Sequence, residues 1–158
     1  MAEEIAARLT PTAFRRVFGV GMLALLGAML LFFGFDGEDI AFGWRIVMIL
    51  MGGGALAGAE MMRRATANSI ELTDEELRDT SGVVLCRLDE IENVDRSAFA
   101  FKPSNGFVVV LKSPADMAWA PGLWWRMGRR IGIGGVTPVA HAKAMCEILT
   151  IKLSERAE

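Results

Sequence analysis

The sequence has little of what metal binding and catalysis usually require. It contains one histidine, His141, and two cysteines, Cys86 and Cys146, which lie far apart from each other. A zinc site needs several such ligands at close spacing, and neither cysteine has a spacing that recruits the histidine. No acidic pair has a neighbour that would mark it as a general acid and base. We therefore expect no enzymatic activity, no metal and no cofactor.

The chain also lacks a surplus of charge of either sign, because its formal net charge at pH 7 is −2. Nucleic-acid-binding domains carry a broad basic field, and the sequence has none. It contains no internal repeat and no low-complexity tract. These absences argue against a nucleic-acid partner.

What the sequence does contain is two long apolar runs near its start. The first, residues 17–35, holds no charged side chain over a length that matches the roughly 30 Å hydrocarbon core of a bilayer. The second, residues 43–62, is less uniform because it includes Arg45 and Glu60, but Trp44 suits a membrane interface. We predict a membrane hairpin with an N-terminal segment at 1–16, spans at 17–35 and 43–62, and a periplasmic loop at 36–42.

Arginines flank the two runs unevenly. Five lie on the side of the chain termini and one lies on the loop side: Arg8, Arg15, Arg16, Arg63 and Arg64 against Arg45. The positive-inside rule then places both termini in the cytoplasm, where the two cysteines should be buried thiols. A cleaved signal peptide is the competing interpretation, but the first run is too long and lacks a small-x-small cleavage site.

A face of small residues runs along the second span. Gly54 and Gly58 lie one helical turn apart, and such a face lets another helix backbone approach closely. The first span of the same chain is one candidate partner, through Val20, Ala24 and Ala28. A second copy of the chain or a larger membrane complex is the other.

Glu60 is the one ionisable residue near the interior of the second span, and such residues are candidate functional sites. Arg63 and Arg64 follow it at three and four residues, the spacing of neighbours on a helix surface. The pattern therefore favours a local ion pair.

Residues 66–158 have the patterns of a small antiparallel sheet closed by a helix. Apolar and polar residues alternate in short runs separated by turn-forming residues such as Ser81-Gly82 and Pro103-Ser104-Asn105-Gly106. Residues 113–127 carry two prolines and three tryptophans and are predicted to be a long loop. The predicted strands are residues 70–73, 77–80, 83–88, 94–102, 107–112 and 129–134.

A helix is predicted after these strands. Thr137 precedes Pro138, the favoured order of an N-cap and a first helical residue. The apolar residues that follow recur at three- and four-residue spacing and should pack against the sheet. They are Val139, Ala142, Cys146, Leu149 and Leu153.

The order of two membrane helices, a small antiparallel barrel and an amphipathic helix resembles that of the bacterial pleckstrin-homology-like domain proteins. The resemblance covers residues 68–153, and its most telling part is Gly82-Val83-Val84 followed by Leu88-Asp89-Glu90-Ile91-Glu92-Asn93-Val94. This part is similar to the family's hydrophobic-acidic-x-Ile stretch, although Leu88 stands where the family has an aromatic residue. The resemblance implies an α+β protein of the bacterial inner membrane with a barrel-like sheet, a C-terminal helix and no family-wide catalytic residues.

The most unusual stretch of the domain combines tryptophan with arginine. Indole rings suit a membrane interface and arginines are attracted to anionic headgroups, so this stretch is a candidate membrane surface. The same residue types also suit a protein partner, and the tryptophans alternatively form a lid on the core. The residues are Trp119, Trp124, Trp125, Arg126, Arg129 and Arg130.

The sequence as a whole predicts a non-enzymatic inner-membrane adaptor or accessory subunit. It is expected to bind membrane lipid and another membrane protein, or itself, through the Gly54/Gly58 face, the tryptophan- and arginine-rich stretch, or both. The alternative is a module that responds to anionic lipid through that stretch.

Overall fold

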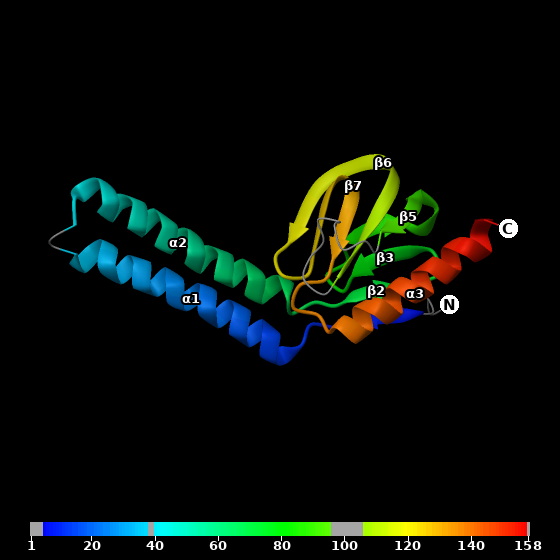
Figure 1. Cartoon of the computed structure of the whole chain (residues 1–158), viewed down its shortest axis with the longest axis horizontal. Helices are drawn as coiled ribbons and strands as arrows, with labels where there is room; N and C mark the ends of the chain where they lie inside the picture. Colours follow the sequence, from blue (N-terminus) through cyan, green and yellow to red (C-terminus); the bar gives the residue numbers. More distant parts are fainter. Residues whose placement is uncertain (1–4, 38–39, 96–105, 158) are drawn as a thin grey trace.

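The computed structural model describes residues 5–37, 40–95 and 106–157. It has two parts, a long helical hairpin and a domain of strands and one helix at the open end of that hairpin (Figure 1). The first described strand and the C-terminal helix both lie in the domain (Figure 1). Two long apolar helices followed by small antiparallel sheets and a C-terminal helix confirm the predicted α+β class.

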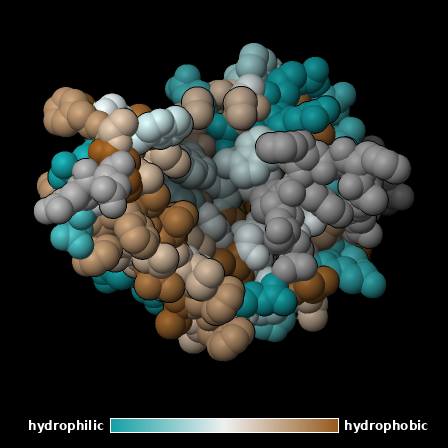
Figure 2. Space-filling view, turned by 60° about the vertical axis from the view of Figure 1, so that its left-hand side comes forward, coloured by the Kyte–Doolittle hydropathy of each residue, from teal (hydrophilic) through white to brown (hydrophobic). Residues whose placement is uncertain are grey.

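The hairpin consists of α1 (Ala13–Asp36) and α2 (Phe42–Ala65), each of 24 residues and each longer than its predicted span. At about 1.5 Å per residue, each helix is about 36 Å long and exceeds the hydrocarbon thickness of a bilayer. Only 11% of the most apolar window of either helix is buried inside the structure, which distinguishes both from the core helix of a soluble protein. Apolar side chains gather over the hairpin, whereas hydrophilic side chains gather on the domain (Figure 2).

The two helices pack through glycines at their closest approach. A Cβ placed on Gly27 would lie 2.9 Å from the carbonyl oxygen of Gly52, and a Cβ on Gly52 would lie 2.9 Å from that of Gly27. Gly34 is buried in the same interface, against Ile49. Glycine at these points lets the two backbones touch, and van der Waals contact of this kind is the main attraction between helices in lipid.

Arginines cap the helix ends of the hairpin. At the loop end, Arg45 of α2 donates to the carbonyl oxygens of Gly34 at 3.0 Å and Phe35 at 2.8 Å, in the last turn of α1. At the domain end, Arg16 of α1 donates to the carbonyl oxygen of Arg63, in the last turn of α2, at 3.2 Å. The last carbonyls of a helix have no intrahelical partner, so each arginine satisfies an acceptor at the negative end of a helix dipole.

The first sheet contains a strand that the sequence analysis did not predict. That strand precedes the hairpin and pairs with the first strand after it, with Arg8 opposite Glu71. The two side chains also form an ion pair across the strands. The antiparallel order of this sheet is β1 (Ala7–Leu9), β2 (Ile70–Leu72), β3 (Glu76–Asp79) and β4 (Val84–Arg87).

The second sheet corrects the predicted loop at residues 113–127. Instead of a loop, one strand continues to Ala120 and the next begins at Trp124, with a tight turn between them. Pro114 is tolerated because it lies where the register shifts, between the pairs Val110–Arg130 and Ala115–Gly128. The 3-10 helix η1 (Leu88–Glu90) leads into this sheet, which has the order β5 (Ile91–Asp95), β6 (Phe107–Ala120) and β7 (Trp124–Ile133).

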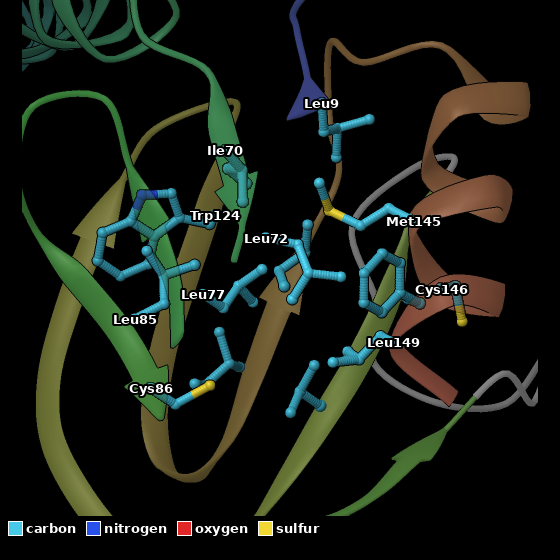
Figure 3. Close-up of a cluster of buried hydrophobic side chains, with 14 of the residues drawn as sticks. Leu9, Ile70, Leu72, Leu77, Leu85, Cys86, Trp124, Met145, Cys146 and Leu149 are labelled. Carbon is cyan, nitrogen blue, oxygen red and sulfur yellow. The ribbon is translucent and has the colours of Figure 1, made fainter. Parts of the chain in front are cut away.

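The helix α3 (Val139–Ala157) confirms the helix predicted after Pro138. Ala142, Cys146 and Leu149 of its apolar stripe are buried, and Met145 is buried with them. Leu9 of β1, Leu72 of β2 and Met145 of α3 lie in one cluster of buried side chains between the strands and the helix (Figure 3). The core of the domain is therefore built partly from Leu9, which precedes the helical hairpin.

Thr137 does not act as the predicted N-cap. Its Oγ1 is buried and has no hydrogen-bond partner within the described ranges, while its carbonyl oxygen accepts from Arg15 at 3.3 Å. The backbone N–H of Thr12 donates to the carbonyl oxygen of Val136 at 3.0 Å. These bonds tie the chain just before α3 to the start of α1.

Two predictions fall wholly or partly outside the described residues. The predicted strand 94–102 is represented only by Val94 and Asp95 of β5, and the predicted turn 103–106 only by Gly106. The described strands form two separate hydrogen-bonded sheets, β1 to β4 and β5 to β7.

Candidate interaction surfaces

The two glycines of the predicted small-residue face of α2 differ in their surroundings, because Gly54 points away from α1 whereas Gly58 lies beside it. A Cβ added at Gly54 would meet no atom of the described chain within 4 Å, and a Cβ at Gly58 would make an ordinary contact with Leu23 at 3.5 Å. On α1, Val20 and Ala24 are half-buried. Ala28 is exposed. The hairpin therefore pairs through Gly27 and Gly52 and leaves Gly54 facing outward.

Charged residues gather at the domain end of α2. Glu60 accepts from Arg63 at 2.7 and 2.8 Å and from Arg64 at 2.6 Å. Both arginine side chains are exposed and that of Glu60 is half-buried, and the three form local ion pairs on one helix surface, as the sequence predicts. Pairs of this kind contribute little to stability, but they mark the end of the apolar part of α2.

The three tryptophans of the predicted site occupy different environments. Trp124 is only 4% exposed, and its indole N–H donates to the buried carboxylate of Asp79 at 3.2 Å. Trp125 is half-buried against Gly132, where a Cβ would overlap the indole ring. Trp119, directly opposite Trp125 in the β6–β7 ladder, is 60% exposed. One tryptophan therefore belongs to the core, and the other two lie on the opposite face of the strands.

Two of the three arginines of the predicted site brace the domain internally. Arg126 donates to the carbonyl oxygens of Asp116 at 2.8 Å, Leu85 at 2.8 Å and Val84 at 3.1 Å, and so bridges β6 and β4. Arg129 donates to the carbonyl oxygen of Leu111 at 2.8 Å and pairs with Glu92. Arg130 is exposed, and no described residue hydrogen-bonds to its side chain. The structure therefore leaves only Arg130 of the three available to an external anion.

A shallow apolar pocket of about 330 Å³ lies beside Trp119 and Trp125. Its wall includes Met117 and Met127, which are 76% and 57% exposed and which the sequence analysis did not select. The signal for them was present, because Met117 and Trp119 alternate with Ala118 and Ala120 at a spacing typical of a strand. The two prolines of the stretch, Pro114 and Pro121, favour a loop and so obscure this alternation.

A larger cleft of about 650 Å³ lies between β4 and the middle of β6. Arg87, Lys112 and Arg126 line it together with acidic side chains, and the buried thiol of Cys86 forms part of its wall. Burial raises the pKa of the Cys86 thiol from 9.0 to about 12, with a smaller contribution from the charge of Glu90. A neutral thiol of this kind is a poor nucleophile and a poor metal ligand.

The remaining candidate residues do not converge. His141 is exposed on α3, and no three histidine, cysteine, aspartate or glutamate residues of the described ranges are placed to hold a metal ion. Comparison of the chain with models of protein families, with curated proteins and with solved structures finds no match. The function must therefore be argued from the surfaces of the hairpin and the domain.

Proposed function

We propose that the protein is anchored in a bacterial inner membrane by α1 and α2 and acts as a non-enzymatic adaptor or accessory subunit. In this proposal it binds another membrane protein, or a second copy of itself, through the outward face of α2. The observation that carries the proposal is that a Cβ at Gly54 would meet nothing of the described chain within 4 Å.

The exposure of the hairpin supports membrane anchoring. Phe14, Phe18 and Leu50 are among many large apolar side chains of α1 and α2 that the rest of the chain leaves uncovered. A soluble monomer rarely exposes a contiguous apolar surface of this extent, whereas a bilayer removes it from water. Twenty-four residues per helix suffice to cross the hydrocarbon core.

The pairing of β1 with β2 supports a two-pass topology. These strands flank the hairpin in sequence and hydrogen-bond to each other, which requires both flanks to lie on one side of the membrane. Arginines are more numerous at that end of the hairpin than at the loop end, where Arg45 stands alone. The positive-inside rule then favours a cytoplasmic domain.

The outward face of α2 suits a partner helix because intrachain packing does not use it. Gly27 and Gly52 already satisfy the close contact between α1 and α2. Gly54 adds nothing to that contact, but it permits another helix backbone to approach.

Affinity purification in mild detergent tests this proposal. A tagged wild-type chain is compared with Gly54→Leu and with Gly21→Leu, a matched control on α1 that also faces open space. We expect a stoichiometric partner, or a dimer, with wild type and Gly21→Leu, and its loss with Gly54→Leu. Retention of the same partner by Gly54→Leu, or a monodisperse monomer without a partner in all three samples, would contradict the proposal.

The pleckstrin-homology-like assignment is also a proposal. The sequential antiparallel strands and the closing helix α3 support it, and an experimental structure that includes residues 96–105 tests whether the strands complete a barrel. The alternative function, a response to anionic lipid, has less support because Arg126 and Arg129 donate to backbone carbonyls of the domain.

A further inference from the structure

The second half of β6 and the first half of β7 form a two-stranded arm, residues 115–120 and 124–128, that has two chemically different faces. On the inner face, Ala118, Ala120 and Trp124 pack on the domain core. On the outer face, the paired residues Trp119 and Trp125 alternate with them. Met117 lies two residues before Trp119 on β6, and Met127 lies two residues after Trp125 on β7.

The outer face of the arm is apolar where a soluble domain would be polar. In an antiparallel sheet with one covered face, the uncovered face normally carries polar side chains that alternate with the buried ones. Here Met117, Trp119 and Met127 are all more than half exposed, and the pocket among them is almost entirely apolar. Together they form an apolar patch that no described part of the chain covers.

The arm is fixed beside the end of the hairpin. A Cβ added at Gly122, in the turn of the arm, would lie 2.9 Å from the terminal methyl carbon of Met62 and 3.1 Å from the methyl carbon of Thr66. The same turn accepts a hydrogen bond from Val136 and so is joined to the chain that precedes α3. The arch of β6 and β7 stands on the side of the domain that faces the helices (Figure 1). The turn of the arm is therefore held at the level where α2 leaves the apolar layer.

We propose that the outer face of the arm lies in the interfacial layer of the bilayer that the hairpin crosses. Met117, Trp119 and Met127 insert among headgroups and upper acyl chains, a position that suits an indole ring and apolar side chains. This inference rests on the proposed membrane anchoring. The contact does not depend on anionic lipid, because Arg126 and Arg129 already donate to carbonyl oxygens of the domain.

Spin-label accessibility in proteoliposomes tests this inference on the full chain. Single cysteines replace Met127, Met117, Leu50 and Ser154 in separate variants, and all four positions are exposed at the surface of the chain. Leu50→Cys reports on the membrane anchor, and Ser154→Cys, near the end of α3, reports on water. Cys86 and Cys146 are buried, and wild type provides the labelling background. Oxygen measures contact with lipid, and a nickel chelate measures contact with water.

We expect the labels at 127 and 117 to be accessible to oxygen and shielded from the nickel chelate, as at position 50. This result should be the same in phosphatidylcholine vesicles with and without phosphatidylglycerol. Nickel access at 127 and 117 with lipid contact at 50 would overturn the inference and leave the anchor intact, whereas nickel access at 50 would overturn both. Shielding from both reagents would indicate a protein partner instead, and shielding only with phosphatidylglycerol would indicate electrostatic binding.

Discussion

At the level of single side chains, the contact between Gly27 and Gly52 decides how closely α1 and α2 approach. Gly52→Leu should push the helices apart, because even a Cβ at that position lies 2.9 Å from the carbonyl oxygen of Gly27. Overpacking of this kind costs about 1–3 kcal/mol. Thermal unfolding in detergent measures the loss, and Gly54→Leu is the matched control because its side chain meets open space within the monomer. Equal melting temperatures for the two variants would contradict this packing.

The buried thiol of Cys86 supplies a prediction about pH. With a pKa raised from 9.0 to about 12, the folded thiol stays neutral up to strongly alkaline pH. At pH 8 the thiolate fraction is then about one in ten thousand, against about one in ten in the unfolded chain. Iodoacetamide should therefore modify Cys86 in denaturant and leave it unmodified in the native protein, as peptide mapping will show. Rapid modification of the native chain at pH 8 would refute the predicted burial.

The raised pKa of Cys86 also makes the stability of the fold depend on pH. Below pH 9 the Cys86 thiol is neutral in both the folded and the unfolded chain, so burial of the thiol does not reduce the free energy of unfolding there. Between pH 9 and about 12 the unfolded chain ionises while the folded chain does not, and stability is lost over that interval.

At the level of strands, Arg126 connects two sheets that no described ladder joins. Its guanidinium donates to carbonyl oxygens of β4 and β6, a forked geometry that a lysine ammonium does not reproduce. Arg126→Lys should destabilise the domain by about 1.5–3 kcal/mol, the usual range for hydrogen bonds to a charged group. Urea unfolding followed by tryptophan fluorescence measures this loss. Arg130→Lys is the control and should leave the midpoint unchanged.

Strands and helices differ in how far the sequence predicts them. The hairpin helices were predicted because an uncharged run of membrane length has few other interpretations. β1 was missed because Ala7–Leu9 is only three residues long, and its partner strand comes after the hairpin. The sequence predicts a loop where the arm lies, because Pro114 and Pro121 argue against strands, but Pro114 lies at a register shift and Pro121 in the turn.

The candidate site was predicted in composition but not in geometry. Trp119, Trp124 and Trp125 were selected together, and strand alternation then separates Trp124 from the other two. Which face meets the core depends on the register shifts in β6, which no local pattern of residues reveals. The bonds of Arg126 to β4 are long-range contacts, and composition alone does not predict them.

At the level of the whole molecule, the fold of the domain depends on β1, which precedes the helical hairpin. Fragment 66–158 lacks Leu9, which is fully buried in the core. Loss of a buried leucine side chain costs about 2–5 kcal/mol, so this fragment should be poorly folded. Circular dichroism and urea unfolding will compare it with residues 5–10 joined by a short linker to residues 69–158.

That fusion is the matched control for the fragment. The hydroxyl groups of Thr10 and Ser69 are 3.1 Å apart, so a short linker can replace the hairpin without strain. We expect the fusion to unfold cooperatively and the fragment to show little cooperativity. Equal stability of the two would mean that β1 is dispensable to the domain.

The pairing of β1 with β2 also imposes an order on biosynthesis. β1 leaves the ribosome before the hairpin and β2 after it, so the first sheet has no second strand until both membrane helices have been made. A chain that inserted only one of those helices would keep the two strands on opposite sides of the bilayer, and its core would remain open. Completion of the domain thus reports correct insertion, and a wrongly inserted chain would present an unfolded segment to the proteases that clear such products.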